Sequence, residues 1–340
     1  MNYNLNERLK TDDISDILNK KPLTREDYIQ KFEAAYNFGP PSFPPQVFIE
    51  LTSICNLKCT FCGYSNMQRE NKLMDRELAK KIIDECAENG VWYLTFQFYG
   101  EPTTIPDYFT EMIKYAKSKG IINVNTTSNM TLMKPKIIKD WIDAGLDTLN
   151  ISFDAAVPEL YEKNRGHSYD KVLKNIIETA EIIKDYGKGI PFTSITLVVT
   201  DETYEEIEEF KKKMSPYVNT FDIRRMLAFD FKTKKKDLYL EQNQNKTKRI
   251  PCREVGPRLI VTSSGETTVC CSDVDAKLSI GNVNEKSIKE IWNSDEMAKI
   301  YMLHRQQRWG ELPEICKTCK DYDWICGMPE PETKDKRWLK

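Results

Sequence analysis

The chain has 340 residues, which favours a large catalytic domain with a smaller appendage over one ordinary module. Its 50 Lys and Arg residues nearly balance 52 Asp and Glu residues, and the net charge of −2 does not indicate a polyanion-binding surface, so we expect no nucleic-acid partner. No apolar run approaches the roughly eighteen residues of a membrane span. The start, MNYNLNERLKTDD, lacks the features of a signal peptide, so we expect a cytoplasmic protein without a membrane partner.

The first part of the chain is polar and ends in GPPSFPP, whose prolines block regular structure. We therefore expect residues 1–45 to form an N-terminal extension and not a domain. One short amphipathic helix is expected near residues 23–36, packed on the main body.

From residue 46 onward, short β-rich runs alternate with amphipathic helical stretches. Strands are expected within residues 46–52, 91–99, 122–128, 146–153, 194–200 and 219–225, and helices near 75–89, 108–119 and 135–144. Such a series predicts parallel βαβ units with right-handed crossovers and helices on the outside. An incomplete barrel or a doubly wound sheet, both of the α/β class, is therefore expected.

A charged stretch rich in Gln and Asn marks a boundary at residues 231–250, which we interpret as a linker. It would separate a main domain of residues 46–230 from a second domain of residues 251–340. In the second domain, we expect a hairpin that turns at Ser264-Gly265 and a helix near residues 287–307.

Ten cysteines in a chain without an export signal are expected to be reduced, and so to be metal ligands or catalysts. Cys55, Cys59 and Cys62 lie within eight residues, directly after the first predicted strand. Three thiolates are one short of the four that complete a [4Fe–4S] cluster, and the iron left open can chelate an amino and a carboxylate group. A zinc site completed elsewhere, or buried structural thiols, is the alternative.

The CX3CX2C spacing, with Phe61 before the last cysteine, resembles the signature of radical S-adenosylmethionine (SAM) enzymes. Tyr99-Gly100-Glu101-Pro102 is similar to that family's GGEP motif, which contacts the SAM amino group, although Tyr99 replaces the first glycine. The resemblance implies a partial (β/α)6 radical SAM barrel, an open [4Fe–4S] cluster, SAM, and an external electron donor such as flavodoxin or ferredoxin.

Further positions resemble the family's SAM contacts in their order along the chain. The resemblance implies that Ser128 and Asn129 lie near the ribose, and that Ser152, Asp154 and Arg165 serve the SAM carboxylate. All follow predicted strand ends, the face where barrel loops assemble sites. Turn or capping roles are the alternative for the serines and for the asparagine. The alternative for the arginine is a surface ion pair with Glu162 or Asp170.

A second group of cysteines lies beyond the linker, and its members can complete a fully protein-ligated cluster, although zinc would suit them equally. The block resembles the SPASM/twitch domains of radical SAM enzymes, including their GX4C element, and implies one auxiliary [4Fe–4S] cluster. The expected ligands are Cys252, Cys270, Cys316 and Cys319. Cys326 is either a substitute ligand or a buried neighbour.

Cys271 directly follows a proposed ligand, so its sulfur is expected to point away from the cluster side and toward a cavity. In some radical SAM epimerases that the block resembles, the second cysteine of such a pair donates a hydrogen atom to the substrate. The alternative is a small buried residue, a role that we expect for Cys86 on the apolar face of its helix.

The resemblance implies reductive cleavage of SAM to a 5'-deoxyadenosyl radical that abstracts hydrogen from a C–H bond. We expect a two-electron oxidation, with epimerisation of a sugar or peptide as the second hypothesis and a non-enzymatic two-cluster electron-transfer protein as the third. Because residues 1–45 are too short for a peptide-recognition domain, a sugar, an aminocyclitol or another small polar substrate is favoured, with a peptide still open. Asp222 and Arg224 are candidate substrate contacts or a structural ion pair.

Overall fold

The computed structural model describes residues 11–200, 202–225 and 249–319, and within them one sheet of nine strands runs through the molecule. Its order is β6-β5-β4-β3-β2-β1-β7-β8-β9. The strands are β1 (Gln46–Ile49), β2 (Tyr93–Phe96), β3 (Asn123–Ser128), β4 (Thr148–Ser152), β5 (Phe192–Val199), β6 (Thr220–Arg225), β7 (Arg258–Val261), β8 (Glu266–Thr268) and β9 (Gly281–Asn282). Neighbours from β6 to β7 are parallel, and β7, β8 and β9 are antiparallel.

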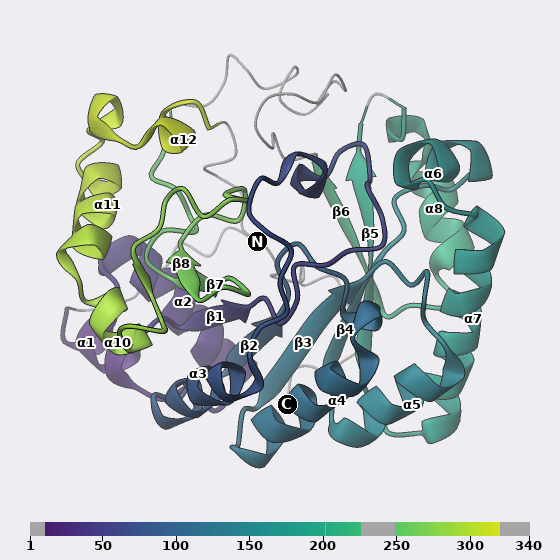
Figure 1. Ribbon diagram of the computed structural model, residues 1–340, viewed down its shortest axis with the longest axis horizontal. Coiled ribbons are helices and arrows are strands. Elements are labelled where there is room, and N and C mark those ends of the chain that lie inside the picture. The colour runs from purple at the N-terminus through teal and green to yellow at the C-terminus, as the bar shows by residue number, and fades with distance from the viewer. Residues whose placement is uncertain (1–10, 201, 226–248, 320–340) are drawn as a thin grey trace.

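Helices cover the outer face of the parallel part, and α4, α5 and α7 are seen along it in Figure 1. The α-helices are α1 (Thr11–Asn19), α2 (Arg25–Phe38), α3 (Arg76–Glu88), α4 (Pro106–Ser118), α5 (Pro135–Ala144), α6 (Pro158–Arg165), α7 (Tyr169–Tyr186), α8 (Ile207–Met214), α10 (Ile288–Trp292), α11 (Asp295–Arg305) and α12 (Glu314–Lys317). The predicted α/β fold, a partial barrel of parallel strands followed by a small C-terminal part, is confirmed.

The crossover helices form where the sequence supplies both an apolar face and end signals. In α5, Pro135 occupies the first turn, and Gly145 adopts a left-handed conformation (φ 94°) directly after the last residue. Its buried Trp141 packs against Phe109 of α4, with ring centroids 4.9 Å apart. Cys86 of α3 is fully buried in the same core, as expected of a structural thiol. No helix among the described residues is long and apolar enough to cross a membrane.

The N-terminal helix α2 packs on the main body, as the sequence predicts. Thr24 caps it in a reciprocal box with Asp27, which fixes the point where the helix begins. The ring of Tyr28 then stacks on Trp92 and Tyr93 at the start of β2, at centroid distances of 5.2 and 5.4 Å. The aromatic stack holds this helix against the sheet.

The C-terminal segment shares its sheet with the barrel, because β7 pairs in parallel with β1. Beneath that pair, the fully buried guanidinium of Arg258 donates two hydrogen bonds to Gln46 Oε1 of β1, at 2.9 and 2.7 Å, and pairs with Glu254. The expected hairpin turn at residues 264–265 is present between β7 and β8.

The helix expected near residues 287–307 is two helices, so that prediction was wrong in extent. Ser287 caps α10 and Ser294 caps α11, and each serine accepts a hydrogen bond from the backbone N–H three residues further on. A second capping residue inside the apolar pattern divides one predicted helix into two. Figure 1 shows this helical group on the side of the sheet where β7 and β8 lie.

One fully buried carboxylate, Glu50, joins three segments at the carboxyl end of β1. Arg69, from the loop that follows the first cysteines, binds it through both terminal nitrogens at 2.6 and 2.5 Å. The backbone N–H groups of Tyr99 and Ser263 donate to the same carboxylate at 3.2 and 2.9 Å. The loops after β1, β2 and β7 are therefore held at one point.

We predict that Glu50→Ala lowers the free energy of unfolding by about 3–5 kcal/mol, because it leaves the largely buried Arg69 guanidinium without its counter-ion. The measurement is anaerobic urea unfolding followed by circular dichroism. Glu311→Ala is the control, because it removes an exposed partner of Arg308 and should leave stability nearly unchanged. Unfolding of Glu50→Ala at the wild-type midpoint would contradict the central role of this carboxylate.

Candidate active site

A cavity of about 230 Å³ opens at the carboxyl ends of the parallel strands, the edge where the sequence predicts a site. Most of the predicted site residues line it: Cys55, Cys59, Phe61, Cys62, Gly100, Glu101, Asn129, Ser152, Asp154, Arg165 and Cys271. Pro102 and Ser128 are buried beside the cavity and do not line it. The structure thus gathers residues that are more than two hundred positions apart in the sequence, from Cys55 to Cys271.

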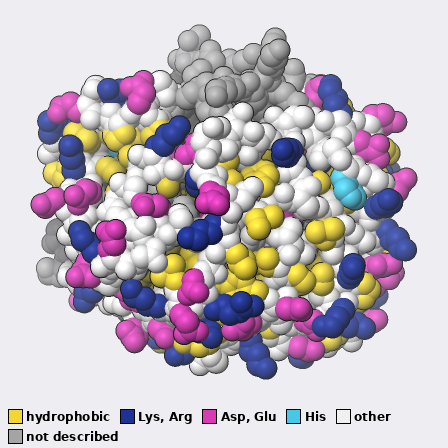
Figure 2. Space-filling model, in the orientation of Figure 1, with side chains coloured by type: hydrophobic (Ala, Val, Ile, Leu, Met, Phe, Trp, Pro, Cys, Tyr) yellow, Lys and Arg dark blue, Asp and Glu magenta, His cyan; other side chains and the backbone are white. Residues whose placement is uncertain are grey.

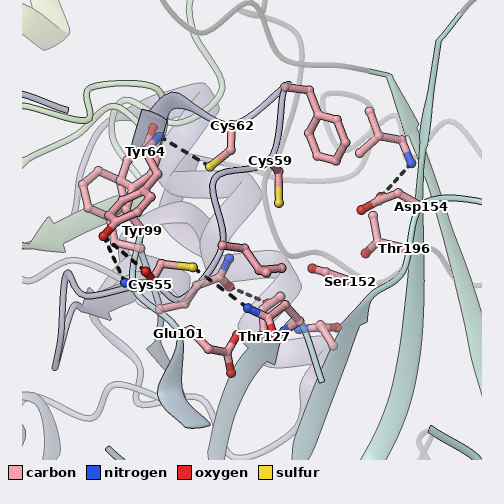
Figure 3. Close-up of a pocket in the computed structure, with 18 of the residues that line it drawn as sticks. Cys55, Cys59, Cys62, Tyr64, Tyr99, Glu101, Thr127, Ser152, Asp154 and Thr196 are labelled. Atoms are coloured by element: carbon pink, nitrogen blue, oxygen red, sulfur yellow. Dashed lines mark hydrogen bonds between the residues drawn. The ribbon is translucent and has the colours of Figure 1, made fainter. Parts of the chain in front are cut away.

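The three cysteines of the first group face one space. Figure 3 shows the sulfur atoms of Cys55, Cys59 and Cys62 pointing into the same part of the cavity. Burial raises the pKa of Cys55 to about 11 and that of Cys62 to about 12. Thiols in this environment stay protonated until a cation displaces the proton, as metal binding does. This donor set fits three corners of an iron-sulfur cluster.

Glu101 is a buried carboxylate with a network of donors. Its Oε1 accepts hydrogen bonds from Thr103 N, Thr103 Oγ1 and Ser128 Oγ at 3.0, 2.6 and 2.8 Å, and its Oε2 accepts one from Asn129 N at 2.8 Å. Burial nevertheless raises its pKa, although the hydrogen bonds from Asn129 and Thr103 oppose the shift. A cation placed beside this carboxylate would be strongly stabilised, and an ammonium group fits that need.

The backbone at Gly100 leaves no space for a side chain. A Cβ at this position would lie 1.9 Å from the carbonyl oxygen of Thr52, so only glycine fits. Tyr99, which stands where the family's motif has glycine, points its ring toward the C-terminal segment. Its hydroxyl donates a hydrogen bond to the carbonyl of Cys271 at 3.2 Å, and this contact connects the loop after β2 to the hairpin region.

Asp154 and Arg165 form a buried ion pair with each other. The predicted alternative for Arg165, a surface pair with Glu162 or Asp170, was wrong. Asp154 adopts a positive φ of 58° and also accepts a hydrogen bond from the backbone of Val198 at 3.0 Å. The guanidinium lies over the ring of Phe61 at 5.4 Å, and its buried Nε has no partner among the described residues. An anion such as a carboxylate could use that donor.

A layer of uncharged polar side chains, which was not predicted from the sequence, lies on the inner walls of the cavity. They are Thr95 and Gln97 near β2, Asn125 and Thr127 of β3, Asn150 of β4 and Thr196 of β5. Polar and apolar residues alternate along these strands in the sequence. The apolar residues between or beside the polar ones are buried in the core, and they are Leu94, Phe96, Val124, Leu149 and Ile195. Polar residues at every second position of interior strands indicate a polar cavity.

The four described cysteines of the second group lie near one another. Burial is the main cause that raises the pKa values of Cys252, Cys270 and Cys316, the last to about 12, and neighbouring cysteines of the group add to each shift. Cys319 is among those neighbours in all three cases. Cys326 lies outside the described residues.

A site for a single metal ion is not preformed in the described part of the chain, where no three His, Cys, Asp or Glu side chains are grouped closely enough to hold one ion. The ligands of an iron-sulfur cluster bind separate iron atoms, so they surround a space and do not meet at a point. The side chain of Cys271 packs in a different apolar cluster from those of Cys252, Cys270 and Cys316. It packs against Phe48 and Ile260 and lines the cavity of the first group.

Two family models match the chain. The radical SAM superfamily matches residues 49–214, and SPASM, an iron-sulfur cluster-binding domain, matches residues 252–320. The chain therefore belongs to the radical SAM superfamily and carries a C-terminal SPASM domain. The first domain implies a [4Fe–4S] cluster with SAM, and the second implies auxiliary iron-sulfur chemistry in the C-terminal part. These groups fit the residues described above, which are the thiols, the buried carboxylate and the arginine.

Curated relatives are similar at low identity. The tungsten-containing aldehyde ferredoxin oxidoreductase cofactor-modifying protein of Pyrococcus furiosus is 23% identical over 337 residues, which cover 86% of this chain and 94% of that protein. The mycofactocin maturase MftC of Mycobacterium tuberculosis is 28% identical over 178 residues, 52% of this chain and 43% of that protein. The chain thus spans less than half the length of MftC.

Solved structures share the fold. Streptococcus suis SuiB bound to its precursor peptide SuiA has a TM-score of 0.63 at 18% identity, over 81% of this chain and 69% of that one. BtrN in complex with AdoMet and 2-DOIA has a TM-score of 0.54 at 16% identity, over 81% and 92% of the two chains. Native anSMEcpe with bound AdoMet and a Cp18Cys peptide has a TM-score of 0.56 at 20% identity, over 82% and 86%.

We predict that Glu101→Gln weakens SAM binding roughly ten- to a hundredfold while iron content stays unchanged, because a charge-assisted hydrogen bond to an ammonium is worth about 1.5–3 kcal/mol. Anaerobic calorimetry measures the affinity. Glu77→Gln, on the exposed side of α3, is the control. If Glu101→Gln binds SAM with wild-type affinity, Glu101 is a structural residue at the end of a strand and does not bind the SAM ammonium.

Proposed function

We propose that this protein is a radical SAM oxidoreductase that removes two electrons and two hydrogens from a small polar substrate of the sugar or aminocyclitol type. Residues 46–230 would form the catalytic unit and residues 251–340 the unit that holds one auxiliary [4Fe–4S] cluster. The observation that carries the substrate class is the layer of uncharged polar side chains on the inner walls of the cavity.

When bound, the open cluster and SAM supply a 5'-deoxyadenosyl radical that abstracts hydrogen from carbon. In this proposal, Cys55, Cys59 and Cys62 bind the cluster, and Glu101 accepts hydrogen bonds from the SAM ammonium. Ser128 and Thr103 orient that carboxylate through their hydroxyl groups. The binding energy at both ends of SAM then fixes the position of its reactive carbon.

At the other end, Arg165 donates to the SAM carboxylate through its unpartnered Nε, and Asp154 holds the guanidinium in place. Phe61 covers one face of this arginine. Phe48 and Phe98 add apolar surface to the cavity, which excludes water from the reacting groups. Ser152 also lines the cavity and is a further candidate contact for the SAM carboxylate.

The deeper walls would bind the substrate. Thr127 Oγ1 donates to Gln97 Oε1 at 2.7 Å, which fixes the carboxamide and leaves its NH2 group for a ligand. Asn150 and Thr196 line the cavity on the neighbouring strands. These neutral donors and acceptors match hydroxyl groups, which both donate and accept. Arg224, paired with Asp222, is the charged group that lines the cavity from β6.

In this proposal, the second electron leaves the substrate through the auxiliary cluster held by Cys252, Cys270, Cys316 and Cys319. An external carrier such as flavodoxin or ferredoxin supplies the electron that starts each turnover. The alternative substrate is a peptide, since SuiB and anSMEcpe were solved with peptides, whereas BtrN was solved with the small molecule 2-DOIA.

A second candidate function is epimerisation, favoured by the position of Cys271 on the cavity wall. Its thiol would give a hydrogen atom to the substrate carbon from the face opposite to abstraction, and the resulting thiyl radical would need an electron and a proton to return to the thiol. A non-enzymatic protein that only transfers electrons would not need a cavity lined by the cysteines together with Glu101 and Arg165.

Anaerobic turnover with candidate sugars, aminocyclitols and peptides tests the proposal directly. Mass spectrometry of product and of 5'-deoxyadenosine reports both halves of the reaction. Substrate-dependent 5'-deoxyadenosine with a product two mass units lighter supports oxidation of the small polar class. Turnover of peptides alone would contradict the substrate class while leaving the radical SAM chemistry intact.

Cys271→Ala separates oxidation from epimerisation. We predict that this variant keeps its activity and yields a product two mass units lighter, without deuterium fixed on carbon in deuterated water, because oxidation needs no hydrogen-atom donor. Small packing changes cost about 1–2 kcal/mol, and Cys86→Ala in the core provides the matched control for them. Retained cleavage of SAM, little product, and one solvent deuterium in the wild-type product would establish the epimerase instead.

A further inference from the structure

The side chain of Asn129 has partners for all of its polar atoms. Its Oδ1 accepts hydrogen bonds from the backbone N–H and the hydroxyl of Thr131, at 2.9 and 2.6 Å. Its Nδ2 donates to Asn56 Oδ1 at 3.1 Å, and Asn56 Nδ2 in turn donates to the hydroxyl of Thr131 at 2.8 Å. The three residues close a ring of hydrogen bonds beside the first cysteine of the signature.

This ring fixes which end of the amide is nitrogen. The backbone N–H of Thr131 can only donate, so the atom that it faces must be the amide oxygen. A flipped amide would place two donors against each other here, and two oxygens against each other at Asn56. The NH2 group of Asn129 therefore points toward Asn56 and Cys55.

The second amide hydrogen is directed at a sulfur. Asn129 Nδ2 lies 3.9 Å from Cys55 Sγ, within reach of an N–H···S hydrogen bond. The other two cysteines have donors as well: Arg165 Nη1 lies 3.7 Å from Cys59 Sγ, and the backbone N of Tyr64 lies 3.5 Å from Cys62 Sγ. Each sulfur of the CX3CX2C group thus has at least one N–H donor among the described residues, and Cys55 also has a hydrogen bond from the backbone of Leu57.

We infer that Asn129 is a positioning residue that raises the reduction potential of the open cluster through the Cys55 sulfur. Reduction adds negative charge that spreads onto the ligand sulfurs, and an N–H donor stabilises that charge more than the oxidised state. The inference rests on the proposed assignment of Cys55 as a ligand. It replaces the expected ribose contact, since the amide has no polar atom left for a hydroxyl.

The test is a potentiometric titration of the anaerobic full-length protein, followed by electron paramagnetic resonance without SAM. In Asn129→Ser, the ratio of reduced to oxidised open cluster at a fixed potential should fall roughly tenfold, which is a shift of about 59 mV for a one-electron couple. The auxiliary cluster should titrate at its wild-type potential and is the internal reference. If Asn129→Ser loses its iron, Asn129→Asp is measured instead, and it should shift the potential further in the negative direction because it adds a charge.

The matched control is Thr131→Val, which removes the hydroxyl that donates to Asn129 Oδ1 and accepts from Asn56 Nδ2, but keeps the backbone N–H of Thr131 and both N–H groups of Asn129. If the reduction potential of the open cluster shifts less in this variant than in Asn129→Ser, the result supports a donor role for Asn129. An equal shift would mean that packing causes the effect, and it would overturn the inference. An unchanged potential in Asn129→Ser with weakened SAM binding would restore the ribose role and also overturn it. Wild-type protein without a SAM-responsive cluster signal would instead refute the assignment of Cys55.

Discussion

The arrangement of the site depends on one buried ion pair, Glu50 with Arg69. A carboxylate with no exposed surface is stable only where cations and N–H groups surround it, and here the donors come from the loops after β1, β2 and β7. The same contact therefore places the cysteine loop, the Tyr99-Gly100-Glu101-Pro102 loop and the SPASM hairpin at fixed positions. The cavity is built where these three segments meet.

The cavity beside this ion pair contains buried polar groups, and their burial disfavours the folded state. Glu101 and Arg165 line the cavity and are buried, and the thiols of Cys55 and Cys62 are held in surroundings that disfavour their ionised form. Such groups are poorly solvated in the protein alone and are better matched by a cluster, an ammonium and a carboxylate. Figure 2 shows, by contrast, an outer face on which acidic and basic side chains are interspersed.

Much of the fold could be read from the sequence, because strand alternation and helix ends are local signals. The cysteine spacings likewise showed which thiols would be neighbours. The sequence did not reveal that β7 joins the barrel sheet beside β1, since strand pairing across two hundred residues leaves no local trace. It also did not reveal the partner of Arg165, because the turn that presents Asp154 depends on a positive φ that spacing does not encode.

The central claim is that the cysteines of CX3CX2C hold an open cluster that binds SAM. The most direct test is electron paramagnetic resonance of the reduced protein, recorded with and without SAM. The same spectra are recorded for a variant in which Cys55, Cys59 and Cys62 are all changed to Ala. We expect SAM to change one cluster signal of the wild-type protein, and we expect this signal alone to be missing from the variant. A SAM-responsive signal that persists in the variant, or zinc in both sites of the anaerobically prepared protein, would contradict it.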